Sequence, residues 1–313
     1  MAIVAIINPI SGAGADRAAA ARRVAMVRTE AERRGLHADI HVTESAGHAR
    51  ELAAASAASG IDLAIVWGGD GTFNEAGAGL LGSGTTIGLV PAGSGNGLAA
   101  VLGVPRDAQA ALAVAFDGVT RTIDAGLIAD RPFFNIAGVG FDARVAKRFN
   151  ERAAGSRGGW PYIAIGIREG CRYRAAHYHL QLDGESRHVR ALLIVFANGR
   201  EYGMGARISP GAELDDGLLD ATVVEERAVL ARFWHARHLA RGTTHLAPSV
   251  SVSKIAHAIV ETEGPIEFHV DGEPGLAHNR VEVRVLPKAL KIRVAISDEG
   301  FSTPAGTAGG IGR

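Results

Sequence analysis

Short apolar runs and longer stretches of helical composition alternate along the first third of the chain. The apolar runs lie at residues 2–7, 63–67 and 87–90, and a further strand-like segment lies at 39–42. Stretches rich in alanine and charged residues, which suit helices, lie near 15–34 and 47–58. Buried strands joined through helices are typical of a parallel sheet that is covered on both faces. The pattern therefore predicts an α/β domain over residues 1–122.

The pattern changes near residue 120, where strand-like segments become closely spaced. These segments lie at 120–129, 133–139, 177–182, 188–196, 219–224, 250–255, 258–262, 266–270, 280–286 and 289–296. Helical stretches near 142–152, 160–171 and 228–239 interrupt them. Many short strands at close spacing indicate a mainly antiparallel β-sandwich domain. We place this domain at residues 123–301, with a last strand that could return to the first domain, and expect a flexible tail at 302–313.

Composition and charge narrow the classes of protein that fit. The length of 313 residues suits two domains, and 33 basic against 33 acidic residues argue against a nucleic-acid partner held by bulk charge. No stretch approaches the ~20 apolar residues that span a bilayer, and the start lacks the basic leader of a secretory signal. The single Cys171 cannot form an intrachain disulfide. We expect a cytoplasmic protein without a transmembrane segment, which could still contact the inner membrane surface peripherally.

Three glycine-rich loops follow three of the apolar runs, at 8–12, 68–72 and 91–96. Glycine lacks a Cβ, so that successive backbone N–H groups can converge on a phosphate oxygen. A carboxylate beside such a site, here Asp70, is repulsive unless Mg²⁺ lies between the two charges or the carboxylate activates a nucleophile. The alternative is a set of tight strand-to-helix turns in which Asp70 is a helix N-cap. Neither common nucleotide-binding fingerprint is present.

The second and third loops carry a more specific signal. The segments Gly68-Gly69-Asp70-Gly71-Thr72-Phe73-Asn74-Glu75 and Pro91-Ala92-Gly93-Ser94-Gly95-Asn96-Gly97-Leu98-Ala99 resemble the diacylglycerol kinase catalytic-domain family, which includes bacterial lipid kinases and sphingosine kinases. Matching anchors occur in the family's order at Asn8-Pro9, 43–49, 138–142, Asn198-Gly199, Pro210, 215–217 and 270–273. Each anchor is weak alone, but together they span nearly the whole chain.

The resemblance implies a Rossmann-like domain of the NAD kinase and diacylglycerol kinase type, with ATP held between it and a β-sandwich domain. It also implies ATP-dependent phosphorylation of a lipid hydroxyl, with ATP and Mg²⁺ as cofactors and a lipid at a membrane surface as partner. The residues that it assigns to ATP are Asn8, Thr43, Gly68, Gly69, Asp70, Gly71, Thr72, Gly93, Ser94 and Asn96. Ser94 and Gly97 stand where most diacylglycerol-type members carry Thr and Asp. Because Ser-Gly-Asn is similar to the sphingosine and ceramide branch, the acceptor stays open between diacylglycerol and a sphingoid-type lipid.

Catalytic roles in the same resemblance fall on carboxylates from both ends of the chain. Asp271 is our expected base for the acceptor hydroxyl, with Glu273 as its partner or as a ligand of a metal-bound water. Asp70 is the rival base. Without the resemblance, 270–273 would be an ordinary hairpin turn, because Asp-Gly is a strong turn dipeptide. The same string recurs at 182–185, where we expect only a turn.

Two further charged segments are ambiguous. Six acids and no base lie between residues 213 and 226, and Asp215, Asp216 and Asp220 could hold a structural Mg²⁺ or belong to a solvated loop. Residues 144–174 hold eight bases against two acids, which suits an anionic membrane surface or an ordinary solvated helix face. Within the motif at 138–142 and the basic segment, Asp142 and Arg157 are candidate phosphate or lipid contacts.

Two other functions stay open beside a lipid kinase. One is a kinase for a soluble acceptor such as NAD, because NAD kinases share the Gly-Gly-Asp-Gly-Thr string. The other is a catalytically silent protein that binds nucleotide or lipid. The sequence also leaves a homodimer open. Retention of Asp70, Asp271 and Glu273 favours an enzyme.

Overall fold

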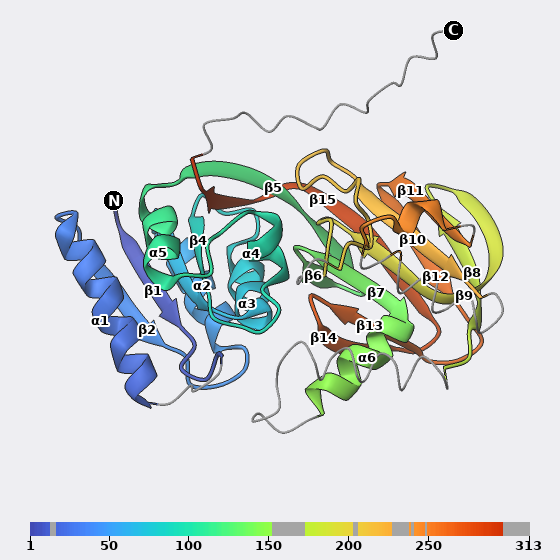
Figure 1. Ribbon diagram of the computed structural model, residues 1–313, viewed down its shortest axis with the longest axis horizontal. Helices are drawn as coiled ribbons and strands as arrows, with labels where there is room; N and C mark the ends of the chain where they lie inside the picture. Colours follow the sequence, from blue (N-terminus) through green and yellow to red (C-terminus); the bar gives the residue numbers. More distant parts are fainter. Residues whose placement is uncertain are drawn as a thin grey trace, which may run out of the picture.

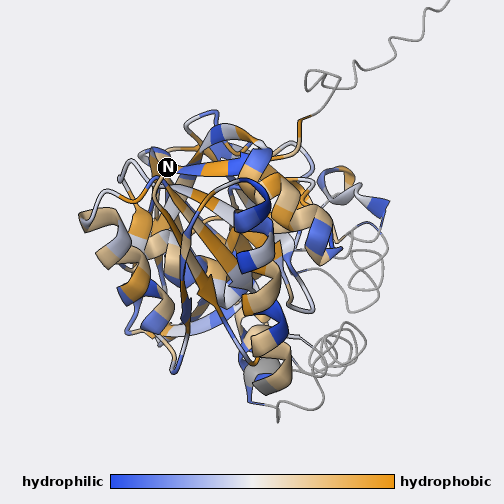
Figure 2. Ribbon diagram, turned by 90° about the vertical axis from the view of Figure 1, so that its left-hand side faces the viewer, coloured by the Kyte–Doolittle hydropathy of each residue, from blue (hydrophilic) through white to orange (hydrophobic). Residues whose placement is uncertain are grey.

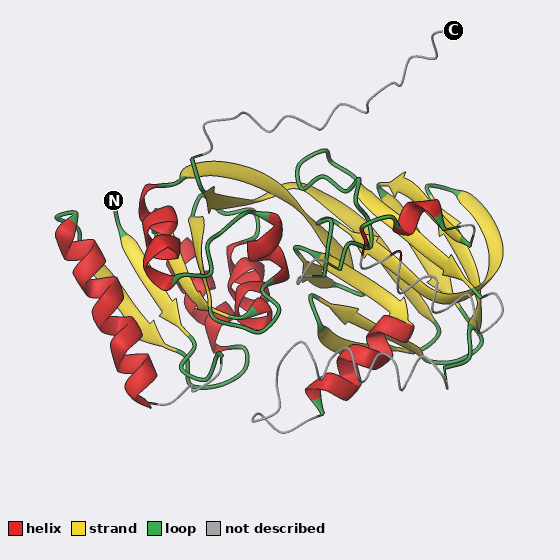
Figure 3. Cartoon of the chain, in the orientation of Figure 1, coloured by secondary structure: helices red, strands yellow, loops and turns green. Residues whose placement is uncertain are grey.

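The computed structural model describes residues 1–12, 17–151, 173–202, 206–226, 238, 241–247 and 249–296. Two domains lie side by side along its longest axis, an α/β domain at the left of Figure 1 and a β-rich domain at the right. Figure 3 shows how helices gather in the first and strands in the second. Among the described residues, no helix is long and apolar enough to span a bilayer.

The first domain is built on a parallel sheet, as the alternating pattern predicts. Its strands, in the order β4-β3-β1-β2, are β4 (Thr86–Pro91), β3 (Leu63–Gly68), β1 (Ile3–Ile7) and β2 (Ala38–Val42). Every residue of β1, β3 and β4 is buried, because helices cover both faces. The apolar strands lie between those helices in Figure 2.

The helices of the first domain form two layers. On one side α1 (Arg17–Arg33) contacts α5 (Ala108–Asp117), and on the other α2 (His48–Ala58) packs against α3 (Asp70–Leu80). The short helix α4 (Gly97–Val101) follows the third glycine loop. Parallel strands place their carboxyl ends at one edge of the sheet, which brings the three loops together there.

The second domain is a mainly antiparallel β-sandwich, again as predicted. Its elements are β5 (Val119–Ile128), β6 (Arg131–Phe133), β7 (Ile136–Gly140), α6 (Phe141–Asn150), β8 (Ala176–Leu182), β9 (Glu185–Ala197), β10 (Leu219–Glu225), the 3₁₀ turn η2 (Thr244–Leu246), β11 (Val250–Ile255), β12 (His257–Glu261), β13 (Ile266–Val270), β14 (Glu273–Ala277) and β15 (Arg280–Val294). Inward-facing side chains such as Phe133, Leu180, Phe196 and Val283 form its core.

The last strand connects the two domains. β15 pairs antiparallel with β5 over most of its length, and its Lys291 and Ile292 also pair in parallel with Thr86 and Ile87 of β4. One continuous sheet therefore runs through both domains (Figure 1). The expected boundary at residue 122 falls inside β5, and the domain limits stay a prediction.

The strand pattern was wrong in three places. Residues 133–139 form two strands rather than one, because Phe134 and Asn135 leave the ladder and donate their N–H groups to Asp271. Residues 280–286 and 289–296 belong to one strand that is irregular between Leu286 and Leu290. β14 was not expected because it contains Pro274 and Gly275, which an edge strand tolerates. Three expectations fall on residues outside the described ranges. They are the helix at 160–171, the helix at 228–239 apart from residue 238, and the tail at 302–313.

Candidate active site

The three glycine loops pack directly against one another at the carboxyl edge of the parallel sheet. The side-chain amide of Asn8 in the first loop donates to Oγ1 of Thr72 at 2.8 Å. A Cβ on Gly93 would lie 2.8 Å from the Cα of Gly69, closer than real Cβ contacts come. Only residues without a side chain allow the second and third loops to approach this closely. The loops thus form one backbone-lined cradle from residues that the resemblance assigns to ATP.

Asp70 joins the second loop to the third. Its carboxylate accepts the backbone N–H groups of Asn96 at 2.8 Å and Gly97 at 2.7 Å, at the start of α4. Asp70 is therefore not the N-cap of its own helix α3, where Gly69 holds that position. Burial, together with the nearby charge of Asp271, raises the pKa of Asp70 to about 6.

The side chain of Asn96 closes the third loop on itself. Its Oδ1 accepts the N–H of Gly93 at 2.8 Å, and its Nδ2 donates to the carbonyl of Gly93 at 2.7 Å. Asn96 is buried and has the left-handed φ of 54° that asparagine tolerates better than most residues. Ser94 lies at the exposed turn of the same loop. Of these two, Ser94 is the side chain available to a ligand, whereas Asn96 shapes the loop.

Asp271 lies in a tight hairpin between β13 and β14 and faces the first domain. Its φ is 47° and that of Gly272 is 90°, which fits a primed hairpin turn. Four N–H groups donate to its carboxylate. They are Nδ2 of Asn74 at 2.9 Å and the backbone N–H groups of Phe134, Asn135 and Ile136 at 2.9, 3.0 and 3.0 Å. Because Asn74 belongs to α3, this carboxylate links the two domains.

Glu273 follows in the same hairpin and reaches the second loop. A Cβ on Gly71 would lie 3.0 Å from Oε1 of Glu273, so that glycine leaves room for the carboxylate. Arg131 supports this hairpin by donating to the carbonyl of Pro274 at 2.8 Å. Burial lowers the pKa of Arg131, and the charge of Glu273 partly offsets this effect.

A buried polar group stands behind the Asp271 hairpin. Nε2 of His269 lies 3.1 Å from Oδ2 of Asp142, and the Tyr202 hydroxyl donates to the same oxygen at 3.1 Å. Nδ1 of His269 accepts the N–H of Gly272 at 3.3 Å. A Cβ on Gly138 would collide with this carboxylate, so glycine is needed there. Asp142 is 6% exposed and its bonds support the hairpin, and a direct contact of Asp142 with phosphate or lipid stays a prediction.

Other candidate residues lie in different settings. Thr43 is buried beside the first loop, where its N–H donates to the carbonyl of Ile7 at 2.9 Å. Glu75 of α3 accepts the N–H of Gly47 at 2.9 Å, which holds the segment after Thr43 near the second loop.

Arg157, in the basic segment, lies outside the described residues. In the described part of the basic segment, Lys147 and Arg148 pair with Glu267 and Glu151, which suits a solvated helix face.

The three aspartates of the acidic stretch at 213–226 lie beside cationic side chains. Arg121 donates to Asp215 at 2.7 and 2.9 Å and holds the pKa of that carboxyl below its usual value. Lys254 contacts Asp216 and lies 3.8 Å from Oδ1 of Asp220. No group of three His, Cys, Asp or Glu in the described ranges is arranged to hold a metal ion. A structural Mg²⁺ at these three carboxylates stays a prediction.

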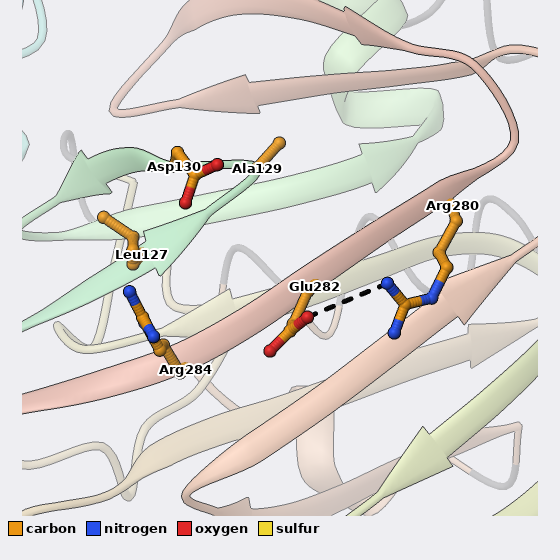
Figure 4. Close-up of a pocket in the computed structure, with 6 residues that line it drawn as sticks. All are labelled: Leu127, Ala129, Asp130, Arg280, Glu282 and Arg284. Carbon is orange, nitrogen blue, oxygen red and sulfur yellow. Dashed lines mark ion pairs between the residues drawn. The ribbon is translucent and has the colours of Figure 1, made fainter.

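One pocket lies apart from the cradle. Its volume is about 260 Å³, and its lining residues are Leu127, Ala129, Asp130, Arg280, Glu282 and Arg284 (Figure 4). Arg280 and Glu282 form an ion pair of 3.8 Å across it. The pocket shares no residue with the glycine loops or with the Asp271 hairpin, so it adds nothing to the site described above.

Sequence reasoning missed three residues that organise the site. Asn74 was quoted only as part of a motif, His269 was not considered, and Arg23 of α1, which binds the first loop, carried no signal. The position of Asn74 four residues after Asp70 could have suggested a shared helix face. Nothing in the spacing of His269 or Arg23 relative to the motifs pointed to them.

Comparison with known proteins agrees with the geometry. The family described as diacylglycerol kinase catalytic domain matches residues 2–128, and that described as YegS C-terminal NAD kinase beta sandwich-like domain matches residues 135–294. A diacylglycerol kinase of Mycobacterium tuberculosis is 34% identical over 309 residues, covering 93% of this chain and 94% of that protein. The "Probable lipid kinase YegS-like" of Citrobacter koseri is 28% identical, covering 91% and 94%.

Solved structures share the fold. The structure of a diacylglycerol kinase from Bacillus anthracis superposes with a TM-score of 0.71 at 20% identity, covering 94% of this chain and 96% of that one. A second structure from the same organism gives a TM-score of 0.79 at 23% identity, covering 94% and 95%. At these identities the superpositions establish the two-domain architecture alone.

Proposed function

This chain belongs to the diacylglycerol kinase family, and from that premise we propose that it transfers the γ-phosphate of ATP to a lipid hydroxyl in the cleft between its two domains. The observation that carries the proposal is the hydrogen bond of 2.9 Å between Asn74 and Asp271. It joins the helix that begins at the second glycine loop to the hairpin that carries Asp271 and Glu273. This bond supports the proposal that the nucleotide cradle and the acidic hairpin act as one site.

The cradle suits a nucleotide phosphate chain for two reasons. Its walls are backbone, since a Cβ on Gly93 would collide with Gly69, and Gly69 and Gly71 leave little room for a side chain. N–H groups in such loops bind anions without the entropy cost of ordering long side chains. Phosphoryl transfer depends mainly on positioning and on stabilising charge, and a rigid loop cluster provides the positioning.

The carboxylates fit a divalent cation that would arrive with ATP. Asp271 is near enough to contribute to the raised pKa of Asp70, and Glu273 lies over Gly71. Carboxylate oxygens are donors that Mg²⁺ prefers. In this proposal Glu273 would hold Mg²⁺, directly or through water, and Asp70 would stay free to take a proton. The ion would neutralise charge on the phosphates during transfer.

The hydrogen bonds divide the roles of the two aspartates. The Asp271 carboxylate already accepts four N–H groups, about the full capacity of its lone pairs. Asp70 accepts two from other residues, and its pKa of about 6 suits a group that takes a proton near neutral pH. We therefore favour Asp70 as the acceptor of the hydroxyl proton and Asp271 as the residue that positions the hairpin, which reverses our first preference.

The test is transfer of label from γ-labelled ATP, with Mg²⁺, to lipids in mixed micelles. The panel is diacylglycerol, sphingosine, ceramide, phosphatidylglycerol and monoacylglycerol, with NAD as a soluble control. We expect label in one lipid class and none in NAD. Label in NAD alone would support the soluble-acceptor alternative. ATP binding without label in any acceptor would support a silent nucleotide-binding protein. Either outcome would contradict the proposal.

A further inference from the structure

The nucleotide cradle lacks positive charge of its own. Residues 8–12, 68–75 and 91–99 contain no Lys or Arg. The acidic side chains in or beside the same loops are Asp70, Glu75, Asp271 and Glu273. A nucleoside triphosphate is strongly anionic, and one Mg²⁺ neutralises only part of its charge. A cationic side chain from elsewhere in the fold would therefore strengthen binding considerably.

Arg23 of α1 reaches the first loop. Its Nη1 donates to the carbonyl of Asn8 at 2.5 Å, and its Nη2 donates to the carbonyl of Ser11 at 2.6 Å. The guanidinium lies 5.9 Å from the centre of the Trp67 ring, at the end of β3. These contacts hold the positive charge beside the loop rather than in solvent, because both the carbonyl oxygens and the ring face favour a cation.

Among the described residues, no acidic side chain balances the charge of Arg23. Within the described ranges no carboxylate forms an ion pair with Arg23, and its charged neighbour is Arg22. Burial and the charge of Arg22 both lower the pKa of Arg23. A half-buried cation without a counter-ion is unfavourable, and an anionic ligand would remove that cost.

Arg23 also sets the shape of the cradle. The carbonyl that it binds at Ser11 directly precedes Gly12, which has a φ of 89°. A Cβ on Gly12 would lie 2.5 Å from the carbonyl oxygen of Ala92 and 4.0 Å from Nη2 of Arg23. The guanidinium thus lies where the first loop meets the third, at the wall of the cradle.

We propose that Arg23 supplies the positive charge that binds the polyphosphate of a nucleoside triphosphate and fixes the first loop around it. The inference rests on the proposed function for the identity of the anion. It uses the guanidinium N–H groups beyond the two that bind the loop carbonyls, since an arginine carries five.

Three variants separate this role from a structural one. Arg23→Met removes the positive charge and the hydrogen-bond donors. Arg23→Lys keeps the charge but lacks the planar guanidinium, whose N–H groups can bind two acceptors at once. Arg28→Met removes an exposed arginine of the same helix as a matched control. Binding of ATP, ADP, adenosine and inorganic tripolyphosphate is measured by titration calorimetry, and thermal unfolding checks that each variant is folded.

We expect R23M to weaken ATP binding about 10- to 100-fold, tripolyphosphate similarly and adenosine less than twofold, with R23K intermediate and R28M unchanged. ATP binding by R23M within twofold of wild type would overturn the inference, as would an equal loss for adenosine, which indicates a structural role. If wild type binds tripolyphosphate but no nucleotide, the proposed function fails, while the tripolyphosphate comparison still decides the role of Arg23. Wild type that binds neither would overturn both.

Discussion

The chain contains the same kind of hairpin twice, and only one copy lies at the candidate active site. Leu182-Asp183-Gly184-Glu185 joins β8 to β9, and Val270-Asp271-Gly272-Glu273 joins β13 to β14. The turns have nearly the same backbone, with φ of 45° and 92° in the first and 47° and 90° in the second. Both aspartates also accept backbone N–H groups from another strand segment. Asp183 receives those of Ala256 and His257.

The difference between the hairpins lies in what the fold places opposite them. Asp183 is exposed and makes its bonds inside the second domain. Asp271 is partly buried and has Asn74 of the first domain as an additional donor. Glu185 and Glu273 are both exposed at the start of a strand, but only Glu273 lies beside a glycine of the cradle, Gly71. The local sequence determines the turn in both cases, and tertiary position determines whether it can take part in chemistry.

The largest expected effect separates the two aspartates directly. Asp271→Asn replaces one acceptor oxygen by an amide that cannot accept the surrounding N–H groups, so the hairpin shifts. We expect the kcat for phosphate transfer to fall by about two to three orders of magnitude. Asp183→Asn should leave kcat within twofold. Steady-state label transfer measures both, and equal losses in the two variants would show that the hairpins differ in nothing that matters to catalysis.

Asp70 gives the next largest effect and a pH signature. A base must be ionised, so with a pKa of about 6 the wild-type kcat/KM should rise as pH increases through 6 and then level. Asp70→Asn should lower the rate about 100-fold and remove this rise. Folding raises the pKa of Asp70, so protonated Asp70 favours the folded state below pH 4. As pH rises through 6 this contribution is lost, and the free energy of unfolding falls by roughly 3 kcal/mol. An unchanged pH–rate profile in the variant would exclude Asp70 as the base.

His269 should have a smaller effect, because it acts through the hairpin. His269→Ala removes the acceptor for Gly272 and the partner of Asp142, and we expect kcat to fall about tenfold with little change in the KM for ATP. His269→Gln can keep both bonds and should recover part of the rate. His257→Ala, at an exposed histidine paired with Glu282, is the control and should be neutral. If His269→Ala lowers stability without any change in kcat, His269 has only a structural role in the core.

The smallest effect is expected at the two glycines. Gly272→Ala and Gly184→Ala both force a side chain into the left-handed region with open space around it, and each should destabilise the protein by about 1 kcal/mol. Chemical denaturation should give similar losses for the two. Phosphate transfer should fall in G272A alone, so a matching fall in G184A would contradict the distinction between the hairpins.

Much of the architecture followed from the sequence for a physical reason. Fully buried strands such as β1 and β3 must be apolar throughout, and the turns after them need glycine, so both features are visible in the chain. The break between β6 and β7 was invisible because its cause, Asp271, lies 135 residues or more away. The same holds for Asp70, whose carboxylate caps α4 rather than its own helix.

Site residues that were hard to predict share one property. Arg23 and His269 act through bonds to backbone groups, with Asn8 and Ser11 in one case and Gly272 in the other. Such bonds place no constraint on the identity of the partner residue, so no motif records them. Sequence motifs contain the residues that shape a loop or face a ligand. They do not contain the side chains that hold those loops in place.

The central claim is that α3 of the first domain and the Asp271 hairpin of the second form one site through the bond between Asn74 and Asp271. A double-mutant cycle on kcat tests it most directly, with Asn74→Ala, Asp271→Asn and the two combined. The account predicts that N74A alone lowers kcat about tenfold and that adding it to D271N lowers kcat no further. Losses that multiply in the double variant would mean that the two residues act independently, and would contradict the account.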